Sequence, residues 1–159
     1  MTTAMILTVS DTRNLDNDKS GKFIAQRLLA HDVQVADRQV VIDDVVDIQS
    51  QFLQFEQQAP DIIITNGGTG IALRDVTIAA ITPLLTTSIP GFGESFREIS
   101  FKEVGTRALA SKAIAGFNHR NQLCYCLPGS TNACQTAMDQ LILPEFAHLL
   151  FERRKDSHH

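Results

Sequence analysis

The sequence has no apolar run long enough to cross a membrane. A membrane-spanning helix needs about 20 consecutive apolar residues, and no segment of the 159-residue chain reaches that length. The N-terminal residues also lack the basic region of a secretory signal, and the apolar stretch from Ile6 to Val9 is too short for its core. We therefore expect a cytoplasmic protein that has no membrane partner.

Cysteine is scarce, since the chain contains only Cys124, Cys126 and Cys134. Their odd number and their spacing match no zinc site. In a strand, Cys124 and Cys126 would share one face, and free cysteine behaves there as a small apolar side chain. The sequence therefore predicts no zinc centre.

Positive charge is also in deficit, with 14 Lys and Arg residues against 18 Asp and Glu and a net charge of −4. Proteins that bind nucleic acid need a basic face for the phosphate backbone. The only basic run, Arg153-Arg154-Lys155, is short and lies near the C-terminus. We expect no nucleic-acid partner, so an anionic substrate would have to be bound by local groups.

Periodic apolar residues predict alternating strands and helices in one domain, residues 1–152, followed by a disordered tail, 153–159. The expected strands are 4–10, 33–42, 61–65 and 123–127. The expected helices are 20–30, 44–58, 74–85, 94–102, 107–116 and 130–152, with a break at 88–93 and a kink at Pro144. This order predicts an α/β fold with a mostly parallel sheet between two helix layers. Ligands of such sheets bind beyond the carboxyl ends of the strands.

A glycine-rich loop, Asn66-Gly67-Gly68-Thr69-Gly70, follows the most apolar predicted strand. Its glycines permit positive φ angles and close approach of a ligand. The loop lacks the Gly-Lys-Ser/Thr of a Walker A loop and the third glycine of the dinucleotide fingerprint. A tight strand-to-helix turn is the alternative interpretation.

Four motifs carry a wider resemblance. They are TVSDTR with D-x-S-G in residues 8–21, TNGGTGIALRDVT in 65–77, IPGFGESFREIS with E-x-G-T in 89–106, and LPGS with Ala133 in 127–133. Their order and content resemble the molybdopterin adenylyltransferase and molybdenum cofactor biosynthesis protein B family over nearly the whole chain.

The resemblance implies a three-layer α/β/α domain that assembles into trimers or hexamers and binds molybdopterin. It also implies an enzyme that transfers AMP from ATP to molybdopterin with Mg²⁺ and releases pyrophosphate. A molybdate-insertion enzyme would then accept the adenylylated pterin. The sequence does not distinguish a molybdenum from a tungsten pathway.

The resemblance further implies the site residues. Asp44 matches the family's catalytic aspartate and is the expected Mg²⁺ ligand, and Asp75 matches a second catalytic position. Expected substrate-binding residues are Ser10, Asp18, Gly67, Gly68, Thr69, Gly70, Ser100, Pro128, Gly129 and Ser130. For each aspartate, and for Ser130, a helix N-cap is the alternative role. Arg74 and Arg97 could bind phosphate or form surface ion pairs.

Some residues depart from the family's catalytic pattern. Residues 42–45 read Ile-Asp-Asp-Val and lack the proline and glutamate of many catalytic members, and Lys22 replaces a proline of the first loop. Arg74 and Asp75 are retained. We therefore expect adenylyl transfer, with a non-catalytic molybdopterin carrier as the alternative and a nucleotide-hydrolysing relative as a weaker one.

Overall fold

The structure is a computed structural model, and it describes residues 1–156. A six-stranded sheet in the order β2-β1-β3-β6-β5-β4 forms its centre. The strands are β1 (Thr3–Val9), β2 (Gln34–Val41), β3 (Ile62–Asn66), β4 (Leu85–Ser88), β5 (Ile114–Asn118) and β6 (Leu123–Leu127). The pairs β1–β2, β1–β3 and β3–β6 are parallel, whereas β5 is antiparallel to both neighbours. The predicted mostly parallel α/β sheet is confirmed.

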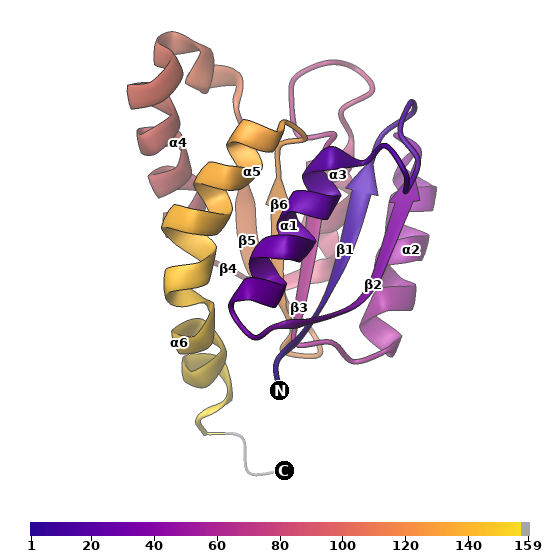
Figure 1. The fold of residues 1–159 in the computed structure, drawn as a ribbon, viewed down its shortest axis with the longest axis vertical. Coiled ribbons are helices and arrows are strands. Elements are labelled where there is room, and N and C mark those ends of the chain that lie inside the picture. The colour runs from indigo at the N-terminus through magenta and orange to yellow at the C-terminus, as the bar shows by residue number, and fades with distance from the viewer. Residues whose placement is uncertain (157–159) are drawn as a thin grey trace.

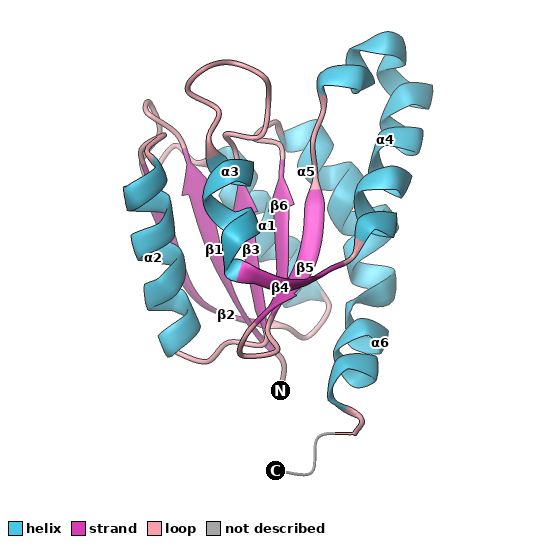
Figure 2. Cartoon of the chain, turned by 180° about the vertical axis from the view of Figure 1, so that it is seen from behind, coloured by secondary structure: helices cyan, strands magenta, loops and turns pink. Residues whose placement is uncertain are grey.

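Helices cover both faces of the sheet (Figures 1 and 2). The helical elements are α1 (Lys19–Ala30), α2 (Val45–Gln57), α3 (Thr77–Ile81), η1 (Thr82–Leu84), α4 (Pro90–Val104), η2 (Gly105–Ala110), α5 (Thr131–Ala137), the π-helical η3 (Met138–Ile142) and α6 (Leu143–Arg154). One core cluster joins α1, α4, α5, η3 and α6 to the sheet, and a second joins α2 and α3 to the opposite face. The three layers therefore enclose two apolar cores.

The central strands are apolar because both of their faces are covered. Ile62, Ile63 and Ile64 of β3 are fully buried, and every residue of β6 is buried. Both termini of the described chain lie at the edge of the sheet opposite the carboxyl ends of β1 and β3 (Figure 1). The carboxyl edge is consequently left to the loops.

Three predicted helices differ from the observed elements. The predicted helix 74–85 contains only α3 and η1 and ends in β4. The predicted break at 88–93 overlaps the start of α4, because Pro90 occupies the first turn of that helix, where its missing N–H is tolerated. The predicted helix 107–116 was wrong, since η2 is followed by strand β5.

The C-terminal helix continues two residues beyond the predicted domain boundary at 152. Arg153 and Arg154 belong to α6, and Arg154 forms an ion pair of 2.8 Å with Asp61. Of the predicted tail, residues 157–159 lie outside the described part. Within residues 1–156, no helix is both long and apolar enough to cross a membrane.

Candidate functional site

A cavity of about 360 Å³ opens at the carboxyl edge of the parallel strands. Its walls come from the loops that follow β1, β2, β3 and β6, with one residue from the segment before β5. The lining residues are Val9, Ser10, Asp11, Thr12, Arg13, Asp43, Gly67, Gly68, Thr69, Gly70, Arg74, Asp75, Ser111, Pro128 and Gly129. This is the edge at which sheets of this type bind ligands.

The glycine loop is shaped by its own packing as well as by the cavity. Gly67 and Gly68 have φ angles of 99° and 70°, a region that side chains with a Cβ rarely adopt. A Cβ at Gly67 would overlap the carbonyl oxygen of Val9, and one at Gly68 would overlap the hydroxyl of Thr77. That hydroxyl donates a 2.8 Å hydrogen bond to the carbonyl of Gly67. The loop is therefore both a tight turn and a wall of the cavity.

Three carboxylates gather on one side of the cavity. The backbone N–H of Asp43 donates to Asp11 Oδ1 over 2.9 Å, and Asp75 Oδ2 accepts from the N–H of Ala72 over 3.0 Å. Burial raises the pKa of Asp43, and the charges of Asp11 and Asp75 raise it further, while Arg74 lowers it. This side of the cavity therefore carries excess negative charge.

Asp44 does not line this cavity. Its Oδ2 accepts hydrogen bonds from the N–H groups of Val46 and Asp47, at 3.0 and 3.1 Å, so its exposed side chain caps the start of α2. The carboxylate that enters the cavity is that of Asp43. The placement expected for Asp44 is corrected accordingly, because the residue immediately before a helix is held by the free N–H groups of its first turn.

Asp18 lies beneath the cavity rather than in its lining. It is 1% exposed and caps α1 by accepting from the N–H of Gly21 over 3.0 Å. It also accepts from the hydroxyl of Thr8 over 2.6 Å and pairs with Arg38 over 3.2 Å. Asp18 therefore supports the loop between β1 and α1.

The other predicted residues divide into two groups. The structure brings together Ser10, Gly67, Gly68, Thr69, Gly70, Asp75, Pro128 and Gly129, and Arg74 with them, in the cavity lining. Ser130 instead caps α5 by accepting from the N–H of Ala133. Ser100 and Arg97 belong to α4 and are outside the lining.

Five polar residues of the cavity lining were not predicted from the sequence: Asp11, Thr12, Arg13, Asp43 and Ser111. The first four directly follow the ends of β1 and β2. Their position after two predicted parallel strands was the available signal, because the carboxyl ends of such strands face the ligand. Ser111 had no such signal, since the strand that follows it was predicted as helix.

Metal ligands are not preassembled in the described part of the chain. Among residues 1–156, no three His, Cys, Asp or Glu side chains form a group ready to hold a metal ion. The three cysteines are buried thiols, and burial raises the pKa of Cys126 and that of Cys134 to about 12. Their burial agrees with the prediction that they act as small apolar side chains.

The sheet topology, the glycine loop and the cavity at the strand ends define an α/β domain that binds a ligand at its carboxyl edge. A family model described as "Probable molybdopterin binding domain" matches residues 5–148. The chain belongs to this family of molybdopterin-binding domains, in its molybdenum cofactor biosynthesis protein B branch, which confirms the family resemblance read from the motifs.

Several relatives share this sequence and fold. A molybdenum cofactor biosynthesis protein B of Staphylococcus aureus strain COL is 51% identical over 155 residues, which cover 96% of this chain and 92% of the relative. A crystal structure of a molybdenum cofactor biosynthesis protein B has a TM-score of 0.92 at 42% identity, covering 97% of this chain and 96% of that one. A tungsten cofactor synthesizing protein of Pyrococcus furiosus has a TM-score of 0.89 at 32% identity, with coverage of 97% and 98%.

Proposed function

We propose that this protein acts in molybdenum cofactor biosynthesis and transfers the adenylyl group of ATP to the phosphate of molybdopterin. The observation that supports the proposal is the division of one cavity between carboxylates, two arginines and a glycine loop. Phosphoryl-group chemistry depends mainly on positioning and on neutralising charge. Such a cavity offers donors for anionic groups next to carboxylates suited to a phosphate-bound cation.

The reaction joins two phosphate groups. An oxygen of the molybdopterin phosphate attacks the α-phosphorus of ATP, a new P–O bond forms, and the bond to the pyrophosphate leaving group breaks. Arg74 would balance negative charge near Asp43 and Asp75, since its charge already acts on Asp43. The N–H groups of the glycine loop would contact the substrate where the backbone carries no side chain.

The carboxylates of the cavity would hold Mg²⁺ together with phosphate oxygens of the substrate. Mg²⁺ commonly takes one or two carboxylates and completes its shell with phosphate oxygens and water. Asp43 would be its principal ligand with Asp11 or Asp75 beside it, because mutual repulsion among these carboxylates is relieved by a cation. When bound, the ion would supply charge neutralisation on the ATP phosphates.

A non-catalytic molybdopterin carrier is the second candidate. The observation that favours it is the departure from the family's catalytic pattern at residues 42–45 and at Lys22. A carrier would bind the pterin through the same glycine loop without needing the carboxylates. The two candidates therefore differ in what Asp11, Asp43 and Asp75 do.

The test is adenylyl transfer from ATP labelled at the α-phosphate to molybdopterin, under anaerobic conditions with Mg²⁺. Label on the pterin with release of pyrophosphate, lost when a chelator removes Mg²⁺, is the expected result. Pterin binding without label transfer would establish the carrier instead. Absence of both binding and transfer would reject the two candidates together.

The proposal includes the assembly and the downstream partner implied by the family. A molybdate-insertion enzyme would take the adenylylated product from a homotrimer or a homohexamer. The metal is inserted after this step, so the cavity would meet a metal-free pterin in a molybdenum or a tungsten pathway alike.

A further inference from the structure

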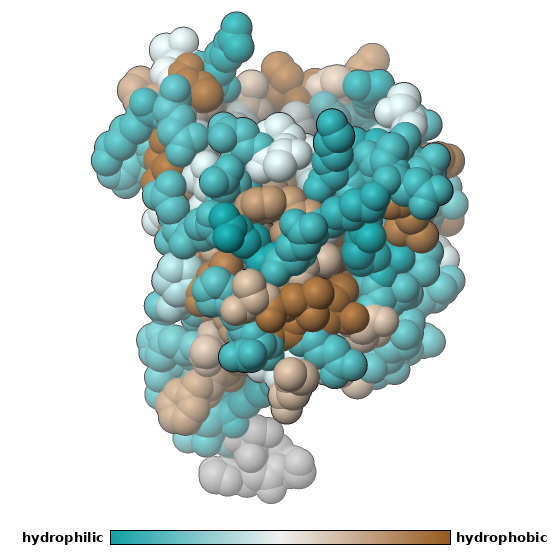
Figure 3. Space-filling model, viewed as in Figure 1, coloured by the Kyte–Doolittle hydropathy of each residue, from teal (hydrophilic) through white to brown (hydrophobic). Residues whose placement is uncertain are grey.

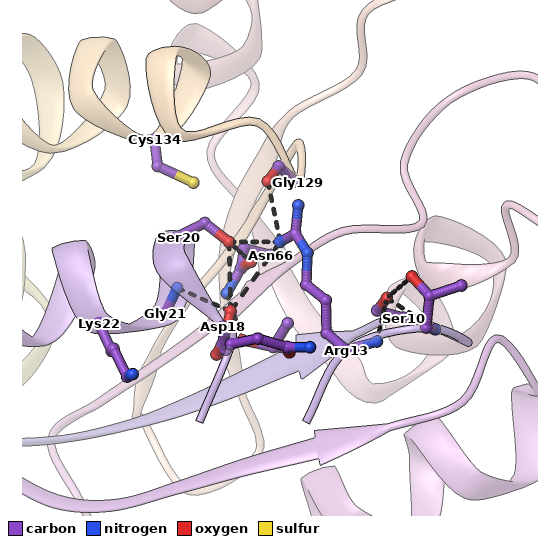
Figure 4. Close-up of polar contacts among 12 residues, drawn as sticks. Ser10, Arg13, Asp18, Ser20, Gly21, Lys22, Asn66, Gly129 and Cys134 are labelled. Atoms are coloured by element: carbon purple, nitrogen blue, oxygen red, sulfur yellow. Dashed lines mark hydrogen bonds and ion pairs between the residues drawn. The ribbon is translucent and has the colours of Figure 1, made fainter. Parts of the chain in front are cut away.

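Arg13 stands at the surface end of a buried chain of hydrogen bonds beneath the cavity (Figure 4). Its Nη1 donates to Ser20 Oγ over 2.8 Å and to the carbonyl of Gly129 over 3.3 Å. Ser20 is fully buried and Arg13 is 35% exposed. Arg13 therefore connects the β1–α1 loop to the β6–α5 loop, and both loops line the cavity.

The chain beneath Arg13 runs through Ser20, Asn66 and Thr8 to Asp18. Ser20 Oγ donates to Asn66 Oδ1 over 2.7 Å, Asn66 Nδ2 donates to Thr8 Oγ1 over 3.0 Å, and Thr8 Oγ1 donates to Asp18 Oδ2 over 2.6 Å. A guanidinium can only donate and a carboxylate can only accept. Ser20 Oγ also lies 3.4 Å from Asp18 Oδ1 as a second acceptor, so it accepts from Arg13 and donates its own hydrogen inward, and Nη1 of Arg13 is held by Ser20 and Gly129.

Two donors of this cavity-lining arginine remain without a partner in the described part of the chain. Among the described residues, neither Nε nor Nη2 of Arg13 has a hydrogen-bond partner, and Arg13 belongs to the cavity lining. These two N–H groups lie on one side of the planar guanidinium, which is the geometry that binds two oxygens of a phosphate. Arg13 thus lines the cavity with a free pair of donors of this geometry.

Charge is distributed unequally between the two sides of the cavity. On the Arg13 side, the single carboxylate of Asp18 lies 3.2 Å from Arg38 and 3.9 Å from Arg13. Two guanidinium groups therefore share one carboxylate, which leaves an excess of positive charge. Around Asp43, two further carboxylates, Asp11 and Asp75, meet the single guanidinium of Arg74. A dianionic phosphate is therefore favoured on the Arg13 side and a cation on the Asp43 side.

We propose that Arg13 binds the terminal phosphate monoester of molybdopterin, and that Ser20 is the positioning residue that holds the guanidinium toward it. The proposal rests on the proposed function and deepens it by assigning one side of the cavity to the nucleophilic phosphate. The phosphate would lie beside Gly129, at the end of β6. Its charge makes Arg13 a determinant of specificity for the phosphorylated pterin.

The experiment compares the dissociation constants of molybdopterin and of the same pterin after enzymatic removal of its phosphate. Wild type should prefer the phosphorylated form by about 10- to 100-fold, since hydrogen bonds to a charged group contribute that much. Arg13→Gln should abolish this preference while binding the dephosphorylated pterin within about twofold of wild type. Ser20→Ala should reduce the preference partially, because Arg13 loses an acceptor but keeps its charge.

Arg97→Gln is the matched control, because Arg97 is an exposed arginine of α4 outside the cavity. It should keep the full phosphate preference. Preference retained in Arg13→Gln, or equal binding of both pterins by wild type, would overturn the assignment while leaving pterin binding intact. Wild type that binds neither pterin would reject the proposed function itself. Thermal unfolding of each variant separates loss of the phosphate contact from loss of the fold.

Discussion

The two neighbouring aspartates after β2 are held in different environments. Asp43 faces the cavity beside Asp11, whereas Asp44 is bound to the N–H groups of the first turn of α2. Their position just after a predicted strand places both at the carboxyl edge of the sheet. It does not tell which one enters the cavity, because that depends on where the helix begins. The N-cap role, left open as the alternative for Asp44, is the one that the structure contains.

Substitution of these two residues should separate catalysis from stability. We expect Asp43→Asn to lower adenylyl transfer by about 10²- to 10³-fold, the usual effect of losing a group that stabilises transition-state charge. Asp44→Ala should retain most of the activity and lose about 1 kcal/mol of unfolding free energy, because an N-cap is removed. AMP transfer and urea denaturation of both variants measure the two effects. Full activity in Asp43→Asn together with loss in Asp44→Ala would reverse the assignment.

The raised pKa of Asp43 gives a pH-dependent effect on stability. A carboxyl whose pKa is higher in the folded state than the ordinary value of 3.8 favours the folded state when protonated and destabilises it when ionised. Asp43→Asn removes the ionised form. We therefore expect the variant to be more stable than wild type at pH 7, and to lose this advantage as the pH falls below the ordinary value of 3.8. Denaturant unfolding at several pH values tests the sign, and a constant difference at all pH values would contradict it.

The mutually parallel strands β1, β2, β3 and β6 could be predicted from the sequence, and the antiparallel strands β4 and β5 could not. The three isoleucines of β3 and the apolar residues of β6 leave little alternative to a covered strand. The segment that contains β5 is rich in alanine, and its pattern favoured a helix. Pairing with β6 and β4 overrides that local preference, as tertiary contacts often do.

Gly116 is the residue that marks this error most clearly. A Cβ at this position would lie 2.5 Å from the carbonyl oxygen of Thr87 in β4. The backbones of β4 and β5 can therefore lie this close only because residue 116 has no side chain. We expect Gly116→Ala to lower the free energy of unfolding by about 1–3 kcal/mol, the range for overpacking a filled site. Chemical denaturation measures it.

Gly91 supplies the matched control for this substitution. It lies in the first turn of α4, and a Cβ there would meet no heavy atom within 4 Å. Gly91→Ala should therefore be neutral or stabilising by up to about 1 kcal/mol, because alanine is the better helix former. Equal losses in the two variants would show that close strand approach is not the cause at Gly116.

The predicted kink at Pro144 takes the form of a change in helix type. The π-helical turn η3 ends at Ile142, directly before the α6 turn that contains the proline. Proline has no N–H and its ring clashes with a carbonyl one turn earlier in a regular helix. The wider turn accommodates this without ending the helical segment. The sequence could indicate the position of the irregularity, but not its geometry.

At the scale of the whole molecule, the cavity could be predicted only in outline. Its location follows from the parallel sheet, and its glycine loop from a local motif. Its charged side chains come from loops that are far apart in sequence. The N–H of Asp43 donates to Asp11, and Arg13 donates to the carbonyl of Gly129, so these placements could be known only from the fold. The net charge of −4 gives no hint of the positive side around Arg13.

The surface of the molecule bears on the expected assembly. The face seen in Figure 3 is mostly hydrophilic, with apolar side chains in small separate groups. In the same view, the C-terminal end of α4, which continues into η2, stands beyond the sheet (Figure 1). There Phe101, Val104 and Leu109 are 51%, 48% and 80% exposed. We expect this region to be covered by another copy in the homotrimer or homohexamer.

Light scattering tests the assembly directly. We expect a mass of three or six times the 17.5 kDa of the chain at micromolar concentration, since homo-oligomers close by symmetry. Leu109→Asp should shift the mass toward 17.5 kDa, because a carboxylate buried in an apolar contact without a partner is strongly unfavourable. Leu29→Asp, on α1 and at a 59% exposed position, is the matched control and should leave the mass unchanged. A monomeric wild type would reject the oligomer, and an unchanged mass in Leu109→Asp would place the contact elsewhere on the surface.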